Sequence, residues 1–216
     1  MSLAASDDRN RPRGSLSAVE PLFTIEPFVG WRRWIVAPGG RDHEPVLAST
    51  IVGHRWESAQ MRAFCVPGDR DGILADPHRA PDPRCSCGIY AFKGPVGELW
   101  TGVGVWAEGT VMLWGRVLET RLGYRAEQAR MIPPLSVRIR CEPEPGALGW
   151  DGILCRRRPT TVVVTRRSYA PLCEFHRRRV EGEIALTPQG FGSAVREALS
   201  HRYGVEVYWR GATRWT

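Results

Sequence analysis

The distribution of hydrophobic residues predicts a chain rich in β-strands. From Leu22 onward, short apolar runs alternate with turns that contain glycine and proline, a pattern typical of strands. The runs predict strands near Ile25–Val36, Leu47–His54, Met61–Cys65, Gly102–Trp106, Thr110–Glu119, Ser136–Cys141, Thr160–Thr165, Tyr169–Cys173 and Val205–Trp209. Two of them, Gly102–Trp106 and Thr110–Glu119, flank Gly109 and predict a β-hairpin. Apolar residues occupy both faces of Thr110–Glu119, which indicates a central, buried strand.

Two segments have helical patterns. Gly123–Arg130 offers about two turns, which Pro133-Pro134 would end. The stronger pattern covers Thr187–Tyr203, where the threonine can cap the helix, Pro188 suits its first turn and Gly204 suits the position after its end. Apolar residues in this segment recur at helical spacing on one face. We therefore expect an α+β fold that is predominantly β.

The net charge is unevenly distributed along the chain. The 216 residues include 30 basic and 23 acidic side chains, a net charge of +7, and Lys93 is the only lysine. A bias toward arginine is typical of GC-rich, bacterial genomes and by itself says little about function. The distribution of the basic residues along the chain is more informative, because residues 136–216 hold 14 basic and 8 acidic side chains. No apolar run approaches the length of a membrane span, and residues 1–20 lack the apolar core of a signal peptide, so a cytoplasmic protein is expected.

The later cysteines lie at spacings that suit a metal ion. In a reducing compartment, cysteines bind metal or pack as small apolar groups more often than they form disulfides. The pattern is C-x17-C-x2-H with a predicted hairpin inside it, and one more cysteine upstream completes a set of four: Cys141, Cys155, Cys173 and His176. Zinc prefers this mixed sulfur and nitrogen set. Residues 141–176 thus resemble small zinc ribbons, although the first pair lacks the usual C-x2-C spacing.

The earlier cysteines form a second group with a histidine. The spacing is C-x12-H-x6-C-x-C, and the candidate ligands are Cys65, His78, Cys85 and Cys87. They bracket the proline-rich loop Val66–Arg84, which is long for an irregular segment. A metal ion would hold that loop closed, so one or two zinc ions are expected in the chain. Unligated cysteines packed in the core are the alternative for both groups.

The basic residues of the last third gather around the later cysteines. The candidate phosphate-binding residues are Arg156, Arg157, Arg158, Arg166, Arg167, Arg177, Arg178 and Arg179. A concentrated group of guanidinium ions attracts a phosphate backbone, which indicates binding to DNA or RNA. An adaptor that binds an acidic protein partner, and a solvated face that serves solubility, are the alternatives.

The tryptophans are expected mainly in the core of the first domain. Nine tryptophans are many for this length, and buried strands use such residues routinely. A base-stacking platform at Trp31–Trp34, where two arginines interleave with two indoles, is the alternative for that run.

An enzyme is the third functional alternative. Cys87 would serve as nucleophile if it opened a helix, and His78 or His54 would act as its base in a hydrolase or transferase. The chain contains no Walker A loop, no G-x-G-x-x-G, no H-E-x-x-H and no G-x-S-x-G. A binding protein is therefore favoured over an enzyme.

These observations predict three parts. Residues 1–18 form a disordered tail, residues 19–135 a barrel- or sandwich-like β-rich domain, and residues 136–216 a basic zinc-ribbon-like module with a closing helix and strand. The expected function is that of a zinc-stabilised binding or regulatory protein whose arginine-rich module engages nucleic acid.

Overall fold

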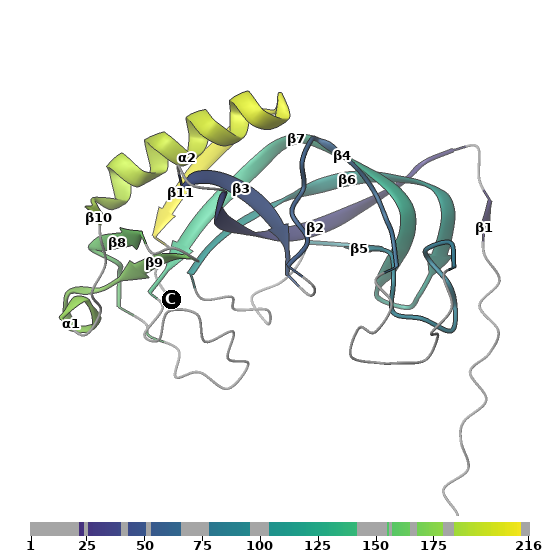
Figure 1. Ribbon diagram of the computed structural model, residues 1–216, viewed down its shortest axis with the longest axis horizontal. Helices are drawn as coiled ribbons and strands as arrows, with labels where there is room; N and C mark the ends of the chain where they lie inside the picture. Colours follow the sequence, from purple (N-terminus) through teal and green to yellow (C-terminus); the bar gives the residue numbers. More distant parts are fainter. Residues whose placement is uncertain are drawn as a thin grey trace, which may run out of the picture.

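The computed structural model describes most of the chain after its first 21 residues. The described residues are 22–23, 26–39, 43–50, 53–65, 78–95, 104–141, 155, 157–164, 168–178 and 184–212. Residues 1–18, expected as a disordered tail, lie outside them. The elements are β1 (Leu22–Phe23), β2 (Phe28–Gly39), β3 (Glu44–Ser49), β4 (Gln60–Arg62), β5 (Ile89–Phe92), β6 (Gly104–Glu119), β7 (Gly123–Arg140), β8 (Thr161–Val164), β9 (Tyr169–Leu172), α1 (Glu174–Arg177), β10 (Ile184–Leu186), α2 (Pro188–Tyr203) and β11 (Val207–Ala212). The expected α+β fold with a predominance of β structure is confirmed (Figure 1).

An eight-stranded sheet forms the body of the molecule. Its strand order is β1-β6-β2-β5-β7-β11, with β3 paired to β2, β4 paired to β7, and β6 paired to β7 as well. The sheet is not a closed barrel, so that part of the expectation is wrong. The physical reason is that β5 has only four residues, and its pairing with β2 is limited to Trp31 and Phe92.

The long strands β6 and β7 differ from the sequence prediction in two respects. Gly109 does not end a hairpin, because β6 runs through it with a shift of register. A Cβ there would lie 2.5 Å from Leu135 Cδ2, so a larger residue would need the Leu135 side chain to move. Gly123–Arg130 is the first half of β7 and not a helix. It pairs with β5 on one side and with β6 on the other, and these ladders outweigh the weak helical preference of two turns. The expected central position of Thr110–Glu119 is confirmed.

The predicted C-terminal helix is confirmed as α2. The side chain of Thr187 accepts a hydrogen bond from the Gly190 N–H at 3.1 Å, and Pro188 occupies the first turn. Gly204 adopts the left-handed conformation (φ 61°) at the end of the helix. The buried residues of α2 are Phe191, Gly192, Val195, Leu199 and Tyr203.

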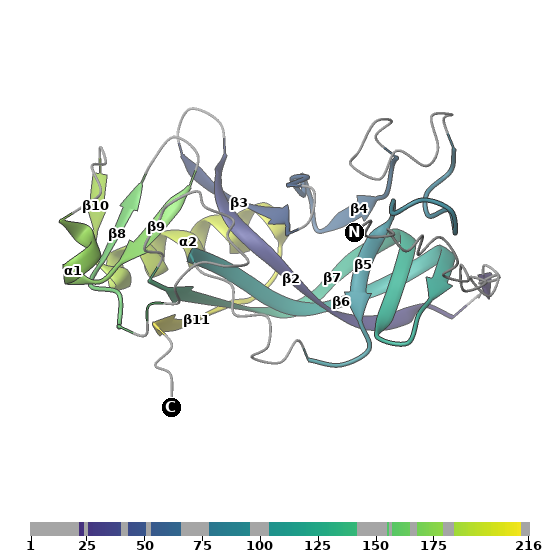
Figure 2. The same ribbon diagram turned by 90° about the horizontal axis from the view of Figure 1, so that it is seen from below.

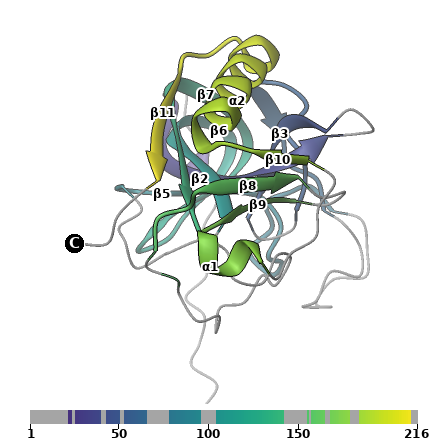
Figure 3. The ribbon, with the colours of Figure 1, turned by 90° about the vertical axis from the view of Figure 1, so that its left-hand side faces the viewer.

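The apolar face of α2 completes a core that both halves of the chain share. One buried cluster contains Trp34 and Leu113 from the large sheet, Val162 from the second sheet and Phe191 from α2. The domain boundary expected between residues 135 and 136 lies inside β7. The small sheet, ordered β10-β8-β9, and α2 therefore pack onto the large sheet as parts of one hydrophobic cluster (Figures 1 and 3).

The hairpin expected between Cys155 and Cys173 is present as β8 and β9, which pair antiparallel from Thr161 with Leu172 to Val164 with Tyr169. Strand β10 adds to the free side of β8. The short helix α1 follows β9 directly and lies at the same end of the molecule (Figure 3). Among the described residues, no helix is long and apolar enough to cross a membrane.

Candidate metal centres

Four of the predicted ligands converge where β7 ends beside the small sheet. We call Cys141, Cys155, Cys173 and His176 the Cys141 cluster; their ligand atoms all lie within 4.8 Å of one another. Cys141 directly follows β7, Cys173 lies between β9 and α1, and His176 belongs to α1. The C-x2-H spacing works because a helical turn after Cys173 returns the imidazole to the thiol, with 3.4 Å between Cys173 Sγ and His176 Nδ1.

The separations in the Cys141 cluster match a tetrahedral ion. Cys155 Sγ and Cys173 Sγ are 3.9 Å apart, and Cys141 Sγ is 3.3 Å from His176 Nδ1. With Zn–S about 2.3 Å and Zn–N about 2.05 Å, a tetrahedron has edges of about 3.8 Å between sulfurs and about 3.6 Å between sulfur and nitrogen. All three thiols are free, so no disulfide accounts for their proximity. The donor set and its spacing therefore fit zinc.

Burial and hydrogen bonding shift the pKa values of the Cys141 and Cys173 thiols in opposite directions. Cys141 is fully buried and Cys173 is only 3% exposed. Burial raises the pKa of Cys141 above its usual range, and neighbouring thiols add to that effect. Burial also acts to raise the pKa of Cys173, but hydrogen bonds from the backbone N–H of His176 and from the adjacent thiols outweigh it and lower the pKa. The Cys173 N–H in turn donates to Cys141 Sγ at 3.2 Å, as backbone amides do to metal-bound thiolates.

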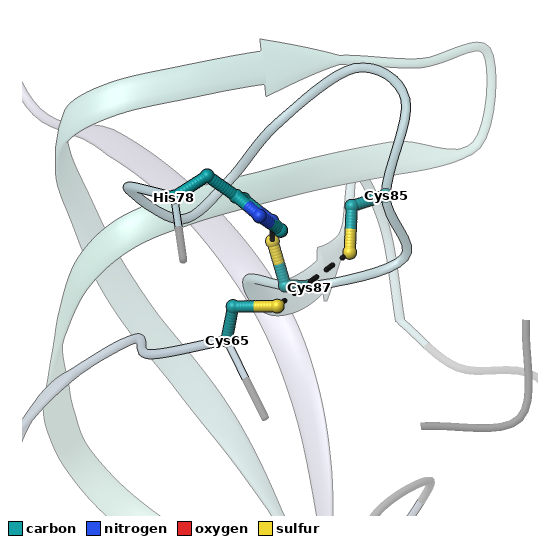
Figure 4. Close-up of side chains that lie close together, drawn as sticks. All are labelled: Cys65, His78, Cys85 and Cys87. Atoms are coloured by element: carbon teal, nitrogen blue, oxygen red, sulfur yellow. Dashed lines mark hydrogen bonds between the residues drawn. The ribbon is translucent and has the colours of Figure 1, made fainter. Parts of the chain in front are cut away.

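The other predicted ligand set also converges. We call Cys65, His78, Cys85 and Cys87 the Cys65 cluster; their ligand atoms again lie within 4.8 Å of one another, and all four residues are half-buried. Cys65 Sγ is 3.7 Å from Cys85 Sγ, and His78 Nε2 is 3.3 Å from Cys87 Sγ. Figure 4 shows the four side chains pointing toward one centre. The two cysteines of the C-x-C pair both reach it, so this short spacing does not prevent convergence.

Arg125 on β7 holds the backbone beside the Cys65 cluster. Its guanidinium donates to the backbone carbonyls of Cys85, Cys87 and Asp82, with the last two at 3.4 Å. These three carbonyls belong to the segment that carries the C-x-C pair. Arg125 therefore positions two of the four ligands without contacting the metal position itself. Sequence reasoning missed it because the surrounding segment was expected to be helical.

Glu127 on β7 anchors the histidine side of the same cluster. Its carboxylate accepts from Arg79 at 2.6 Å, from Arg62 at 3.0 Å and from the Arg116 backbone N–H at 3.3 Å. Arg79 directly follows the candidate ligand His78, so the ion pair with Glu127 ties that part of the chain to the sheet. Burial acts to raise the pKa of Glu127, but the hydrogen bonds and charges of these arginines outweigh it and lower the pKa below its ordinary value of 4.5.

Glu127→Gln is expected to lower the free energy of unfolding by about 1–3 kcal/mol at pH 7, because a buried carboxylate loses charge-assisted bonds. The lowered pKa sets the sign of the pH dependence. The contribution is complete above pH 4.5 and is lost as the pH falls through the folded-state pKa. Urea unfolding of wild type and variant should therefore show a difference that shrinks below pH 4.5. The matched control is the exposed Glu57→Gln; an equal or pH-independent effect in both variants would contradict the role given to Glu127.

Cys87 and His78, the candidate nucleophile and base of the enzyme alternative, lie 3.3 Å apart, but Cys87 is not at the start of a helix. Cys87 does not open a helix, because the residues after it form strand β5, so that part of the hypothesis is wrong. Burial raises the pKa of the Cys87 thiol to about 12, and the neighbouring Cys85 and Cys65 contribute in the same direction. A nucleophilic cysteine needs the opposite shift. His78 and Cys87 belong to a group of four residues that could hold one metal ion.

Half of the predicted phosphate-binding arginines can be placed beside the Cys141 cluster. The described ones are Arg157, Arg158, Arg177 and Arg178, whereas Arg156, Arg166, Arg167 and Arg179 lie outside the described residues. The Arg157 guanidinium lies 5.3 Å from the centre of the Phe175 ring, which is 47% exposed. Arg178 forms a 3.9 Å pair with Glu174 in which both side chains are almost fully solvated, so the pair does little to neutralise its charge.

Comparison with known proteins assigns no family to the chain. No protein-family model matches the chain, no curated protein matches its sequence, and no solved structure matches its fold.

Proposed function

We propose that this protein is a zinc-stabilised nucleic-acid-binding protein with two structural Cys3His sites. One observation carries the proposal: every cysteine of the chain belongs to one of two clusters, and each cluster adds one histidine. Cysteines that merely fill a core have no reason to divide into two sets of three around an imidazole at tetrahedral spacing. The two ions would each be held by four protein ligands, the arrangement of structural rather than catalytic zinc.

Zinc accounts for the cysteine-rich donor set better than other common ions. Magnesium and calcium take oxygen ligands, and neither cluster offers one. Copper(I) also binds thiolates, but tetrahedral sets with three thiolates and one imidazole are typical of structural zinc. Zinc in these positions would supply folding free energy by joining segments that are distant in the sequence, Cys65 to Cys87 and Cys141 to His176.

The nucleic-acid part of the proposal is supported by charge near the Cys141 cluster. Arg157, Arg158, Arg177 and Arg178 flank its ligands, and all but Arg177 are exposed. Glu174 is the one acidic residue of α1. A fixed zinc module would present these guanidinium groups together at one end of the molecule, where a polyanion can release counterions on binding.

The double variant Arg157→Gln with Arg158→Gln is expected to weaken binding of DNA and RNA of all sequences alike. Each lost phosphate contact should flatten the slope of log K against log salt by about 0.9 on a duplex or about 0.7 on a single strand, so the pair should change it by up to about 2 units. Fluorescence anisotropy with labelled oligonucleotides over a range of salt concentrations measures this slope.

The matched control is Arg84→Gln with Arg121→Gln, which removes the same charge from exposed positions elsewhere. Identical slopes for the two double variants would contradict a role for the Cys141-cluster arginines. A wild-type slope near zero would contradict nucleic-acid binding itself and favour an acidic protein partner.

A further inference from the structure

The large sheet has a face that neither α2 nor the small sheet covers. We call this side of β2, β6 and β7 the outer face; Figure 2 views the molecule from the side opposite to α2. Residues of β2 alternate strictly between the two sides, so the run at positions 31–34 is divided. Trp34 and Arg32 point into the core, where Trp34 is fully buried, whereas Trp31 and Arg33 belong to the outer face.

The outer face exposes apolar and aromatic surface. Trp31 is 36% exposed and Val29 is 55% exposed, and they are two residues apart on the same side of β2. Their cross-strand partners on β6 are Thr110 and Met112, both half-buried. Trp31 thus exposes part of its surface to solvent on a strand that is held by pairing with β6 and, at Trp31 itself, with β5.

The same face carries a surplus of positive charge. Arg33 and Arg138 come from β2 and β7, and both lie beside Glu108, with Arg33 Nε at 2.8 Å and Arg138 Nε at 3.9 Å from its carboxylate. Arg130 lies in the row of Val29 and Met112, and it is exposed. Of the acidic residues on these strands, Glu108 is the one that lies beside Arg33 and Arg138. Glu127 is buried, and Glu119 pairs with Lys93.

The outer face adjoins the Cys141 cluster at the end of β7. The guanidinium groups of Arg33 and Arg140 lie 5.7 Å and 5.6 Å from the centre of the Trp106 ring, and both Trp106 and Arg140 are buried. Arg140 is the last residue of β7 and immediately precedes the ligand Cys141. Arg140 and Trp106 thus join the outer face to the cluster by packing rather than by exposed charge, at about 20 Å along β6 from Met112.

We propose that the outer face binds single-stranded nucleic acid, with an unpaired base stacked on Trp31 and phosphates bound by Arg130 and Arg138. The inference rests on the proposed nucleic-acid function and adds the strand type and the surface. Negative charge is the complement of the arginine surplus, and an exposed indole adds a stacking surface that only an unstacked base can use. Bases inside a duplex are already stacked, so the duplex would use the arginines alone.

The test uses full-length, zinc-loaded protein and labelled oligothymidine of about 12 nucleotides, a length within the range of known single-strand sites, beside a duplex of equal length. Trp31→Ala should weaken oligothymidine binding about 5- to 150-fold and change duplex binding little, whereas Trp31→Phe should retain most of the affinity. Leu122→Ala, at a residue 65% exposed in the β6–β7 turn, is the matched control and should change neither.

The possible results separate the two proposals. Unchanged oligothymidine affinity in a folded Trp31→Ala, together with weakened binding in Arg157→Gln with Arg158→Gln, would overturn the outer-face site and leave the nucleic-acid function in place. Absence of salt-dependent binding in the wild type would overturn both. A wild-type dimer that Trp31→Ala converts to a monomer in sedimentation, with unchanged affinity, would assign the face to a second copy of the chain and overturn the inference.

Discussion

Cys173→Ser is expected to remove about one of two zinc equivalents and to unfold the small sheet and its surroundings. The Cys173 thiol interacts with the thiols of Cys141 and Cys155 and with the imidazole of His176, so its loss affects every other residue of the cluster. Structural zinc contributes about 10–16 kcal/mol in small zinc-binding peptides, which is comparable with the whole stability of a domain, about 5–15 kcal/mol. Metal analysis of purified protein and its thermal unfolding measure the two effects.

A matched pair of histidine variants controls for a general loss of stability. His176→Ala should resemble Cys173→Ser in zinc content and unfolding temperature, because each removes one of four ligands from the same ion. His201→Ala, at an exposed position of α2, should leave both unchanged. Zinc-free wild-type protein that keeps its unfolding temperature, with six freely titratable thiols, would contradict a structural metal and support cysteines that only pack.

The two converging sets of cysteines and histidines could be predicted from the sequence because the chemistry of candidate metal ligands does not depend on secondary structure. Cysteine and histidine are rare here, and the spacing alone separates Cys65–Cys87 from Cys141–His176. Each predicted set of four is brought together although the first set carries an unusual C-x-C pair and the second lacks a C-x2-C pair. A metal site demands only that the ligands converge, and loops as well as strands can achieve that.

The residues that support the ligands could not be predicted in the same way. Gly123–Arg130 has helix-favouring composition, and the choice between helix and strand was made by long-range pairing with β5 and β6. Reading this segment as a helix hid Arg125 and Glu127, whose partners, apart from the Arg116 backbone N–H, lie more than 35 residues away in the sequence. Local patterning carries no signal for such contacts.

The pairing that joins the two parts of the chain could not be predicted from local sequence patterns either. Strand β11 pairs in parallel with β7, which places the last described strand beside residues 135–139. Cys141 directly follows β7. The Cys141 cluster is therefore attached to the large sheet through Cys141 and to β9 and α1 through Cys173 and His176. Loss of zinc there should disturb packing on both sides, since Val162 and Phe191 share one cluster with Trp34.

Cys85→Ser is expected to remove the other zinc equivalent with a smaller fall in unfolding temperature than Cys173→Ser. All four residues of the Cys65 cluster are half-buried, whereas the three cysteines of the Cys141 cluster are buried together. The expected effect is local: limited proteolysis should cut the chain between Cys65 and His78, because the ion that joins those residues is gone. Mass spectrometry of the fragments locates the cut, and metal analysis counts the remaining zinc.

Two further variants test whether this local effect depends on the metal ion. Ser86→Ala, at the exposed residue between the two cysteines of the C-x-C pair, should keep both zinc ions and full protease resistance. Arg125→Met retains all four ligands but removes the donor to three carbonyls of the ligand segment, so it should lower zinc affinity at this site by roughly 10- to 100-fold, the usual range for groups that orient ligands. Equal protease resistance in Cys85→Ser and wild type would mean that packing and the Glu127 ion pairs, rather than a metal ion, hold this part of the chain.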